Sequence, residues 1–212
     1  PLYGIVYKPT KNVSLFANHT ESFQEGSIVT MGTFENGGEV LPPTKTKQNE
    51  IGVKYKNKGF MASLSYFDMN RQATFDRTVD GKTWRTIDGE LNYKGLELSV
   101  GGQIAPKWTL NGGLLFINSS YKNHATYEGR QVLGTPKWSG VGILQYAPDE
   151  KTSIFGRAVF TGSAPIYTES NRTLDIPSSI VYDLGIRHKT KINKTPVTLT
   201  ATCFNVLGKD YW

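Results

Sequence analysis

The sequence has 212 residues, of which 38% are hydrophobic, and its mean hydropathy is -0.38. No run of 18 apolar residues occurs, which excludes membrane-spanning helices. The formal net charge is +6, but the 24 Lys and Arg residues are scattered through turns and loops without a dense basic stripe, so no nucleic-acid partner is expected.

The chain alternates between short and long connections. Each short connection has the Pro, Gly, Asn or Asp that turn geometry needs. The short turns are Lys8 to Asn12, Lys56 to Gly59, Ala105 to Lys107, Ala147 to Lys151 and Lys191 to Thr195. The long loops between them are expected at about Thr20 to Thr46, Asn70 to Arg85, Ser119 to Pro136 and Thr161 to Pro177. Because successive antiparallel strands reverse direction, all short turns are predicted at one rim and all long loops at the other.

About ten segments between these connections alternate apolar and polar residues with a period of two, which predicts antiparallel β-strands with two different faces. The alternation is clear in Phe60 to Tyr66, Leu96 to Ile104, Pro177 to Lys191 and Val197 to Cys203. It is weaker in Val13 to Asn18, Ile51 to Tyr55 and Trp138 to Tyr146. A transmembrane strand needs only about 9 to 11 residues, half of them apolar, so the low hydropathy does not exclude a membrane barrel.

Aromatic residues beside the short turns indicate that the apolar face points outward, toward lipid. Tyr7, Tyr55, Trp108 and Tyr146 each lie next to such a turn, as in an interfacial girdle. The alternative is that Tyr and Trp simply favour strands. The apolar faces are small and aliphatic, and the polar faces are rich in Ser, Thr and Gly, which suits a watery lumen. The sequence therefore predicts an all-β, up-and-down transmembrane barrel with its apolar face toward lipid.

No pattern of a catalytic or metal site is present. His19, His124 and His188 are far apart in sequence and lack the close spacings of metal ligands. The nucleophile elbow GxSxG, the phosphate-binding loop and the zinc motif HExxH do not occur. We therefore expect neither an enzyme nor a protein-bound metal or cofactor.

Four motifs resemble those of TonB-dependent siderophore receptors and follow the family's order. They are the opening YGIVYKPTKNVSLFANHTESFQEGS, the hairpin YKGLELSVGGQIAPKWTL at Tyr93 to Leu110, the strand entry GTPKWS at Gly134 to Ser139, and FNVLGKDYW at the end. Each motif alone would be weak evidence, but together they cover nearly the whole chain.

The resemblance implies a ferric siderophore receptor of the Gram-negative outer membrane, with a plug inside a 22-stranded barrel. Residues 1–212 would form about ten strands of the C-terminal portion of that barrel, roughly strands 12 to 21, without the plug domain and the final strand. The implied partners are a ferric siderophore, membrane lipids and, for the intact receptor, the TonB complex. The siderophore itself would hold the iron.

The same resemblance implies that the long loops capture the ligand with aromatic faces and with cationic or polar groups. Packing between loops is the alternative role for such side chains. The candidates are Phe23, Phe34, Phe75, Arg77, Trp84, Tyr121, Tyr127, Arg130 and Tyr167.

Three other functions stay open at this point. A TonB-dependent importer of haem, vitamin B12 or a sugar would have nearly the same barrel. A passive porin would share the alternation but lack the four motifs. A soluble, secreted β-sandwich or barrel that binds carbohydrate would instead bury Leu98, Ile180, Leu184 and Leu199 in a dry interior.

Overall fold

The computed structural model describes residues 1–124, 126–168 and 172–211, and the described part is all β. Its strands are β1 (Leu2–Tyr7), β2 (Val13–Gln24), β3 (Thr44–Asn57), β4 (Phe60–Val79), β5 (Lys82–Ala105), β6 (Trp108–Lys122), β7 (Trp138–Tyr146), β8 (Thr152–Thr161), β9 (Ala164–Tyr167), β10 (Thr173–Ile176), β11 (Ser179–Ile192) and β12 (Thr195–Cys203). Within these residues, no helix is long and apolar enough to cross a membrane.

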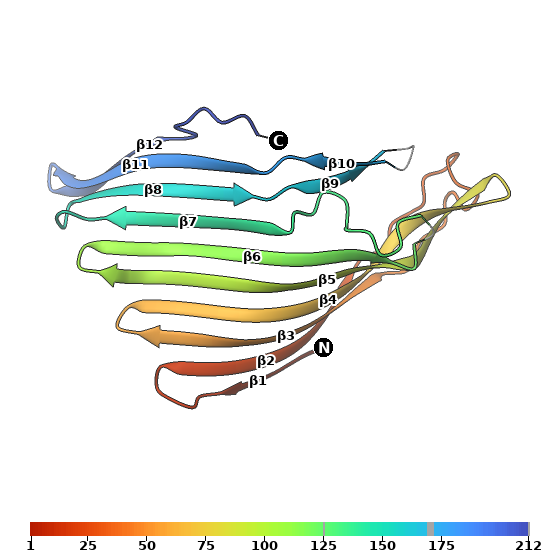
Figure 1. Cartoon of the computed structure of the whole chain (residues 1–212), viewed down its shortest axis with the longest axis horizontal. Helices are drawn as coiled ribbons and strands as arrows, with labels where there is room; N and C mark the ends of the chain where they lie inside the picture. Colours follow the sequence, from red (N-terminus) through yellow and green to blue (C-terminus); the bar gives the residue numbers. More distant parts are fainter. Residues whose placement is uncertain (125, 169–171, 212) are drawn as a thin grey trace.

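Ten of the strands form one curved antiparallel sheet in the order β1-β2-β3-β4-β5-β6-β7-β8-β11-β12 (Figure 1). Within the described chain the sheet is open, with β1 and β12 at its edges. Strands β9 and β10 form a separate two-stranded sheet at the long-loop end. The predicted number of wall strands is confirmed, whereas the β9–β10 hairpin was not expected.

All five predicted short turns join neighbouring strands at one rim, at the left in Figure 1. Three of them are two-residue hairpin turns, and two of these have positive φ at both residues, Lys58 and Gly59 in one and Asn193 and Lys194 in the other. In the turn between β5 and β6, Pro106 precedes Lys107, whose φ is 70°. The local turn chemistry thus fixes the hairpin register on this side.

The opposite rim is elaborate, as predicted, but one of its four connections is not a loop. Strands β4 and β5 continue through the range Asn70 to Arg85 and meet in a tight turn at Asp80 and Gly81, which both have positive φ. The prediction of a long loop there is wrong, because the turn signal Asp-Gly lies between two long segments that pair with each other. The expected connections at Ser119 to Pro136 and Thr161 to Pro177 include residues 125 and 169–171, which lie outside the described residues.

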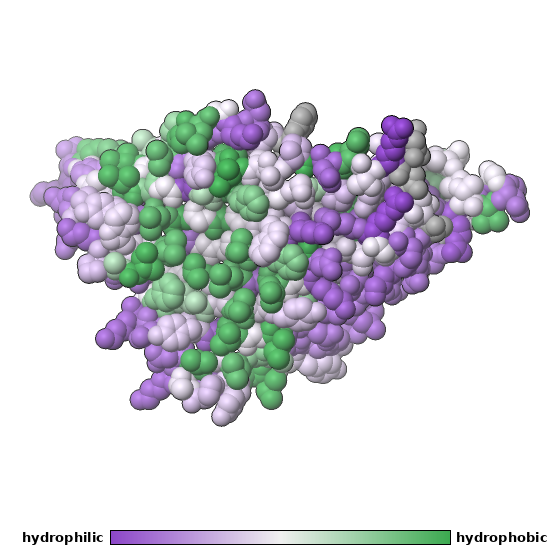
Figure 2. Space-filling model, viewed as in Figure 1, coloured by the Kyte–Doolittle hydropathy of each residue, from purple (hydrophilic) through white to green (hydrophobic). Residues whose placement is uncertain are grey.

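The apolar face of the sheet is exposed, and no dry core lies against it in the described part of the chain. The diagnostic side chains Leu98, Ile180, Leu184 and Leu199 are 39%, 40%, 53% and 55% exposed. Figure 2 shows apolar side chains gathered in a band across the strands, with hydrophilic residues at the short-turn end and toward the long-loop end. This distribution matches a wall whose outer face contacts lipid, and it excludes a soluble sandwich built around these residues.

Aromatic pairs mark both edges of the apolar band on strands β6 and β7. Trp108 and Tyr146 are register partners with ring centroids 4.7 Å apart, and so are Phe116 and Trp138. Trp108 and Phe116 face the same side of β6, and eight residues of strand correspond to about 26 Å along its axis. With a strand tilt of about 40°, this length corresponds to about 20 Å along the membrane normal, which fits within an apolar band about 25 Å tall.

The opposite, polar face is packed by phenylalanines that lie on glycines of neighbouring strands. A Cβ atom on Gly95 would lie 2.1 Å from the Phe116 carbonyl oxygen and 2.7 Å from the Phe67 ring. A Cβ on Gly185 would lie 2.2 Å from the Phe155 ring. These glycines leave the space in which large rings lie flat against the wall, so the curved sheet is closely packed where they occur.

A buried carboxylate on the polar face fixes the segment after β12. The Asp183 side chain accepts a hydrogen bond from the Arg157 guanidinium at 2.8 Å and another from the Asn205 backbone N–H at 2.8 Å. The Asn205 side chain then bonds both the N–H and the C=O of Lys209 at 2.9 Å. The last motif of the sequence thus builds a compact turn attached to β11.

We expect Asn205→Ala to loosen this turn. The substitution removes two side-chain hydrogen bonds and places alanine at a φ of 48°, so local stability falls by about 2 kcal/mol. Hydrogen exchange of residues 204–211, measured by mass spectrometry on the intact protein, should accelerate accordingly. Asn205→Gly tolerates the positive φ but lacks the two side-chain hydrogen bonds, so it should lose about half as much local stability as Asn205→Ala. Unchanged exchange in both variants would contradict the assigned role of the side chain.

Candidate functional site

Five aromatic side chains from three segments meet at the long-loop end. We call Phe75, Tyr121, His124, Tyr127 and Tyr167 the aromatic cluster. Phe75 comes from β4, Tyr121 from the end of β6, and Tyr167 from β9, while His124 and Tyr127 lie in the connection between β6 and β7. The ring centroids of neighbouring members lie 4.3 to 5.9 Å apart. Strand β4, the connection between β6 and β7, and strand β9 therefore converge on one point above the wall.

Tyr121 anchors the cluster to strand β6. Its backbone N–H donates to the Arg130 carbonyl at 3.0 Å, and its carbonyl accepts from the Gly129 N–H at 2.9 Å. Its hydroxyl accepts a hydrogen bond from the Leu133 N–H at 3.2 Å. Since Tyr121 is itself buried, the loop that follows β6 folds back over the strand end and is held there.

The outer part of the cluster is a stacked pair of tyrosines with a cation beside it. The Tyr127 and Tyr167 rings are nearly parallel, at 22°, with centroids 5.0 Å apart. The Arg130 guanidinium lies 5.9 Å from the Tyr127 centroid and 5.6 Å from the Tyr167 centroid. Burial raises the pKa of the Tyr167 phenol, whose hydroxyl donates to the Gln131 carbonyl at 2.6 Å. The pair thus offers aromatic faces and a positive charge together.

His124 is neutral in this environment because its ring nitrogen serves as an acceptor. The Nδ1 atom accepts hydrogen bonds from the Thr126 and Tyr127 N–H groups at 3.2 and 3.3 Å. Burial among the rings lowers the pKa of His124 below its ordinary value of 6.5, and Glu128 and Asp88 oppose this shift. Protonation of Nδ1 would remove both hydrogen bonds and charge the centre of the cluster.

The stability of the folded loop around His124 should therefore depend on pH. A histidine with a lowered pKa stabilises the folded loop fully above its ordinary value of 6.5, and this stabilisation is lost as pH falls from there toward the lowered folded value. Hydrogen exchange in residues 126–134 of the intact protein should therefore be faster at pH 5 than at pH 7.5. In His124→Asn, which can accept the same backbone bonds but does not titrate, the difference between the two pH values should largely disappear. A wild-type difference that survives this substitution would assign the pH dependence to another group.

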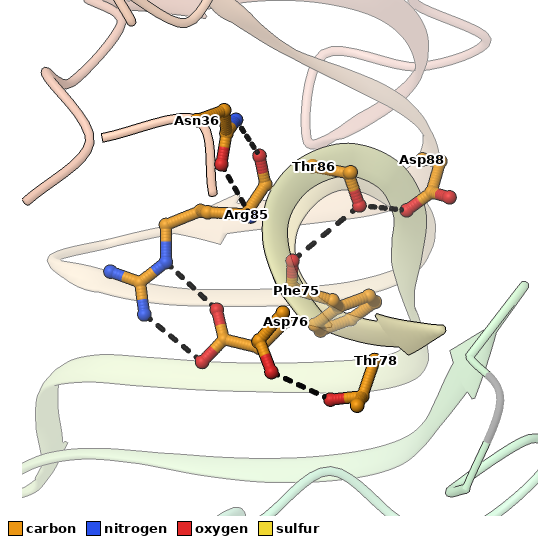
Figure 3. A network of polar contacts seen from close by, with 8 residues as sticks. Asn36, Phe75, Asp76, Thr78, Arg85, Thr86 and Asp88 are labelled. Carbon is orange, nitrogen blue, oxygen red and sulfur yellow. Dashed lines mark hydrogen bonds and ion pairs between the residues drawn. The ribbon is translucent and has the colours of Figure 1, made fainter. Parts of the chain in front are cut away.

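A second set of contacts joins the connection between β2 and β3 to the β4–β5 hairpin. The Asn36 side-chain amide donates to the Arg85 carbonyl at 2.9 Å and accepts from the Arg85 N–H at 3.1 Å (Figure 3). The Arg85 guanidinium binds both carboxylate oxygens of Asp76, at 2.8 and 3.1 Å, and lies over the Phe34 ring at 4.2 Å. The Asn36 amide bonds the Arg85 backbone in the same way as a neighbouring strand would. It therefore attaches the connection between β2 and β3 to the edge of the β4–β5 hairpin.

Five of the nine residues proposed from the sequence gather at the aromatic cluster, namely Phe75, Tyr121, Tyr127, Arg130 and Tyr167. The other four lie elsewhere. Phe34 packs under Arg85 in the loop–hairpin contact just described. Arg77 forms an ion pair with Asp88 at 2.9 Å and is the register partner of Trp84 in the hairpin. Phe23 is 66% exposed on β2, with the Lys45 ammonium 5.6 Å from its ring.

Sequence reasoning missed His124 and the Asn36–Arg85 contact. His124 lies between Tyr121 and Tyr127 in the sequence, and this aromatic spacing within a long loop could have identified it. Asn36 and Arg85 are distant in sequence, so no local pattern marks them as partners. Among the residues that the structure describes, no group of three or more His, Cys, Asp or Glu could hold a metal ion.

Comparisons of the sequence and of the structure with known proteins match the chain to one family. Residues 1–206 match the family model described as TonB dependent receptor-like, beta-barrel. An uncharacterized TonB-dependent receptor of Haemophilus influenzae is 29% identical over 98% of this chain and 62% of its own length. The ferrichrome receptor FcuA of Yersinia enterocolitica is 28% identical over the whole chain and 28% of its own length. The crystal structure of BauA, the ferric preacinetobactin receptor of Acinetobacter baumannii, superposes with a TM-score of 0.83 at 26% identity, covering 100% of this chain and 32% of BauA.

Proposed function

Because the chain belongs to the TonB-dependent receptor-like β-barrel family, whose members lie in the outer membrane of Gram-negative bacteria, we propose that it is part of a receptor that binds ferric siderophores and imports them with TonB. The chain spans less than two thirds of the length of the relatives it matches. The parent protein would therefore supply the remaining barrel wall and the contact with TonB. The family consists of transport receptors, so the proposed mechanism is binding and gated passage.

The aromatic cluster with Arg130 is the observation that carries the proposal. Siderophores that chelate iron through catecholate or phenolate groups present flat rings and a negatively charged iron complex. The stacked Tyr127 and Tyr167 rings can contact such a ring, and Arg130 can attract the anionic chelate. The loops that hold these groups are joined to the wall by backbone hydrogen bonds, which preorganises the site.

Competition binding on the intact receptor tests the proposal. The purified receptor would be titrated with a ferric catecholate siderophore, a ferric hydroxamate siderophore, haem, vitamin B12 and an oligosaccharide, with tryptophan quenching as the readout. We expect the ferric catecholate to bind at least tenfold more tightly than the other ligands. Preferential binding of haem, vitamin B12 or the sugar would replace the proposed cargo within the same family.

The uptake mechanism needs its own test. Iron accumulation from the preferred complex should stop when the parent receptor is expressed in cells without TonB. If uptake continued in these cells at the same rate and without saturation, a passive channel would replace the receptor mechanism. A receptor of the proposed kind should instead show saturable uptake that requires both the receptor and TonB.

A further inference from the structure

The rim of short turns carries the whole positive charge surplus of the chain. The five turns between Lys8 and Thr195 contain eight lysines, but only two carboxylates, Asp149 and Glu150. The rest of the sequence contains sixteen basic and sixteen acidic residues and is therefore neutral. In sequence these lysines are scattered, but the antiparallel order of the sheet brings all five turns to one rim (Figure 1).

These turn lysines are exposed, and their charges are not neutralised within the described part of the chain. All eight belong to exposed residues, and none forms an ion pair among residues 1–124, 126–168 and 172–211. The Lys107 ammonium bonds the neutral Pro148 carbonyl at 2.7 Å. The Asp149 carboxylate instead caps its own turn, by accepting the Lys151 and Thr152 N–H groups at 2.7 Å. The rim therefore presents uncompensated cationic groups to its surroundings.

Three of the lysines have backbone conformations that are unfavourable for a lysine residue. Lys58, Lys107 and Lys194 have φ values of 40°, 70° and 71°, in the left-handed region where glycine or asparagine is the favoured residue. Turn geometry alone does not call for lysine at these positions. Their common property is the charge, which the turns carry at a conformational cost.

The lysines also lie at a defined depth relative to the membrane. Trp108 and Tyr146 lie in contact at the edge of the apolar band, and the turns project just beyond this level. Aromatic rings at this edge mark the membrane interface, and flexible lysine side chains beside them reach the headgroup region. We propose that the turn rim is a binding surface for the phosphate groups of anionic phospholipids in the adjacent leaflet. Such contacts would anchor the barrel at a fixed depth, independently of the cargo.

A charge-removing variant tests this surface. The Lys58→Asn, Lys107→Asn and Lys194→Asn triple variant removes three charges with a residue that tolerates positive φ, so the turns should keep their shape. The intact receptor in zwitterionic detergent would be titrated with fluorescent phosphatidylglycerol and phosphatidylcholine at low and high salt. Wild type should prefer phosphatidylglycerol at least a hundredfold, and the preference should weaken with salt. With about a fivefold effect per lysine at a charged lipid surface, the triple variant should bind phosphatidylglycerol about a hundredfold more weakly.

A matched control carries the same substitutions outside the short-turn rim. Lys122→Asn, Lys137→Asn and Lys209→Asn change three exposed lysines outside the short turns and should leave phosphatidylglycerol affinity within about twofold. Equal losses in the two triple variants, or equal binding of the two lipids by wild type, would overturn the proposal. Soluble glycerophosphate that binds as tightly as the lipid would indicate a free-phosphate site, and tighter binding of polyglutamate would indicate an acidic macromolecule. Either result would also overturn the lipid assignment.

Discussion

Gly95→Val is expected to destabilise the barrel wall by about 3 kcal/mol or more. Gly95 is buried on β5, between its register partners Phe67 and Ile117. Its new Cβ would overlap the Phe116 carbonyl oxygen as well as the Phe67 ring. A ring can turn away, but a backbone carbonyl in a strand ladder cannot move without breaking the ladder. Urea unfolding of the intact receptor in detergent, followed by tryptophan fluorescence, measures the loss.

Gly142→Val is the matched control for this experiment. Gly142 also lies within a wall strand, but nothing lies within 4 Å of a Cβ built at this position. Its stability should therefore stay within about 1 kcal/mol of wild type. If both variants lost the same stability, the loss would be a general effect of replacing glycine by valine in a strand of this barrel, and not a clash at Gly95. If neither lost stability, the close packing of rings on glycines would not contribute to the wall.

Tyr127→Ala is expected to weaken binding of the preferred ferric siderophore by about thirtyfold or more. Tyr127 contacts three members of the aromatic cluster and lies beside Arg130, so its removal takes away one face of the stacked pair. Central aromatic contacts of this kind typically contribute about 2 kcal/mol or more to binding. Equilibrium titration of the intact receptor with the ferric complex gives the affinity directly.

Two controls separate ligand contact from loop packing. Tyr167→Phe keeps the stacked ring and loses only the hydrogen bond to Gln131, so affinity should change by less than about fivefold. Phe23→Ala removes an exposed ring outside the cluster and should leave affinity unchanged. Full affinity in Tyr127→Ala, with the loop still protected from hydrogen exchange, would show that the cluster serves only to pack the loops.

The barrel wall could be predicted from the sequence because the residues that specify each strand face and each turn lie close together in the chain. The alternation in Val197 to Cys203 and the turn residues at Lys56 to Gly59 specify strand faces and hairpins within a few residues. They determine an antiparallel wall with plain and elaborate rims, and the exposed leucines confirm its apolar face. The β4–β5 hairpin was missed because its polar sequence resembles a loop, although Asp80 and Gly81 carry the turn signal.

The sequence by itself therefore determined the strand faces, the turns and the family resemblance. Only the tertiary structure decided which loop residues meet, because Tyr121 and Tyr167 are brought together by connections that no local period describes. The same is true of the lysine-rich rim, since charges that are scattered along the chain gather only when the register of ten strands places their turns side by side. Local backbone preferences act over a few residues, whereas loop contacts and surface charge depend on the long-range pairing of the whole sheet.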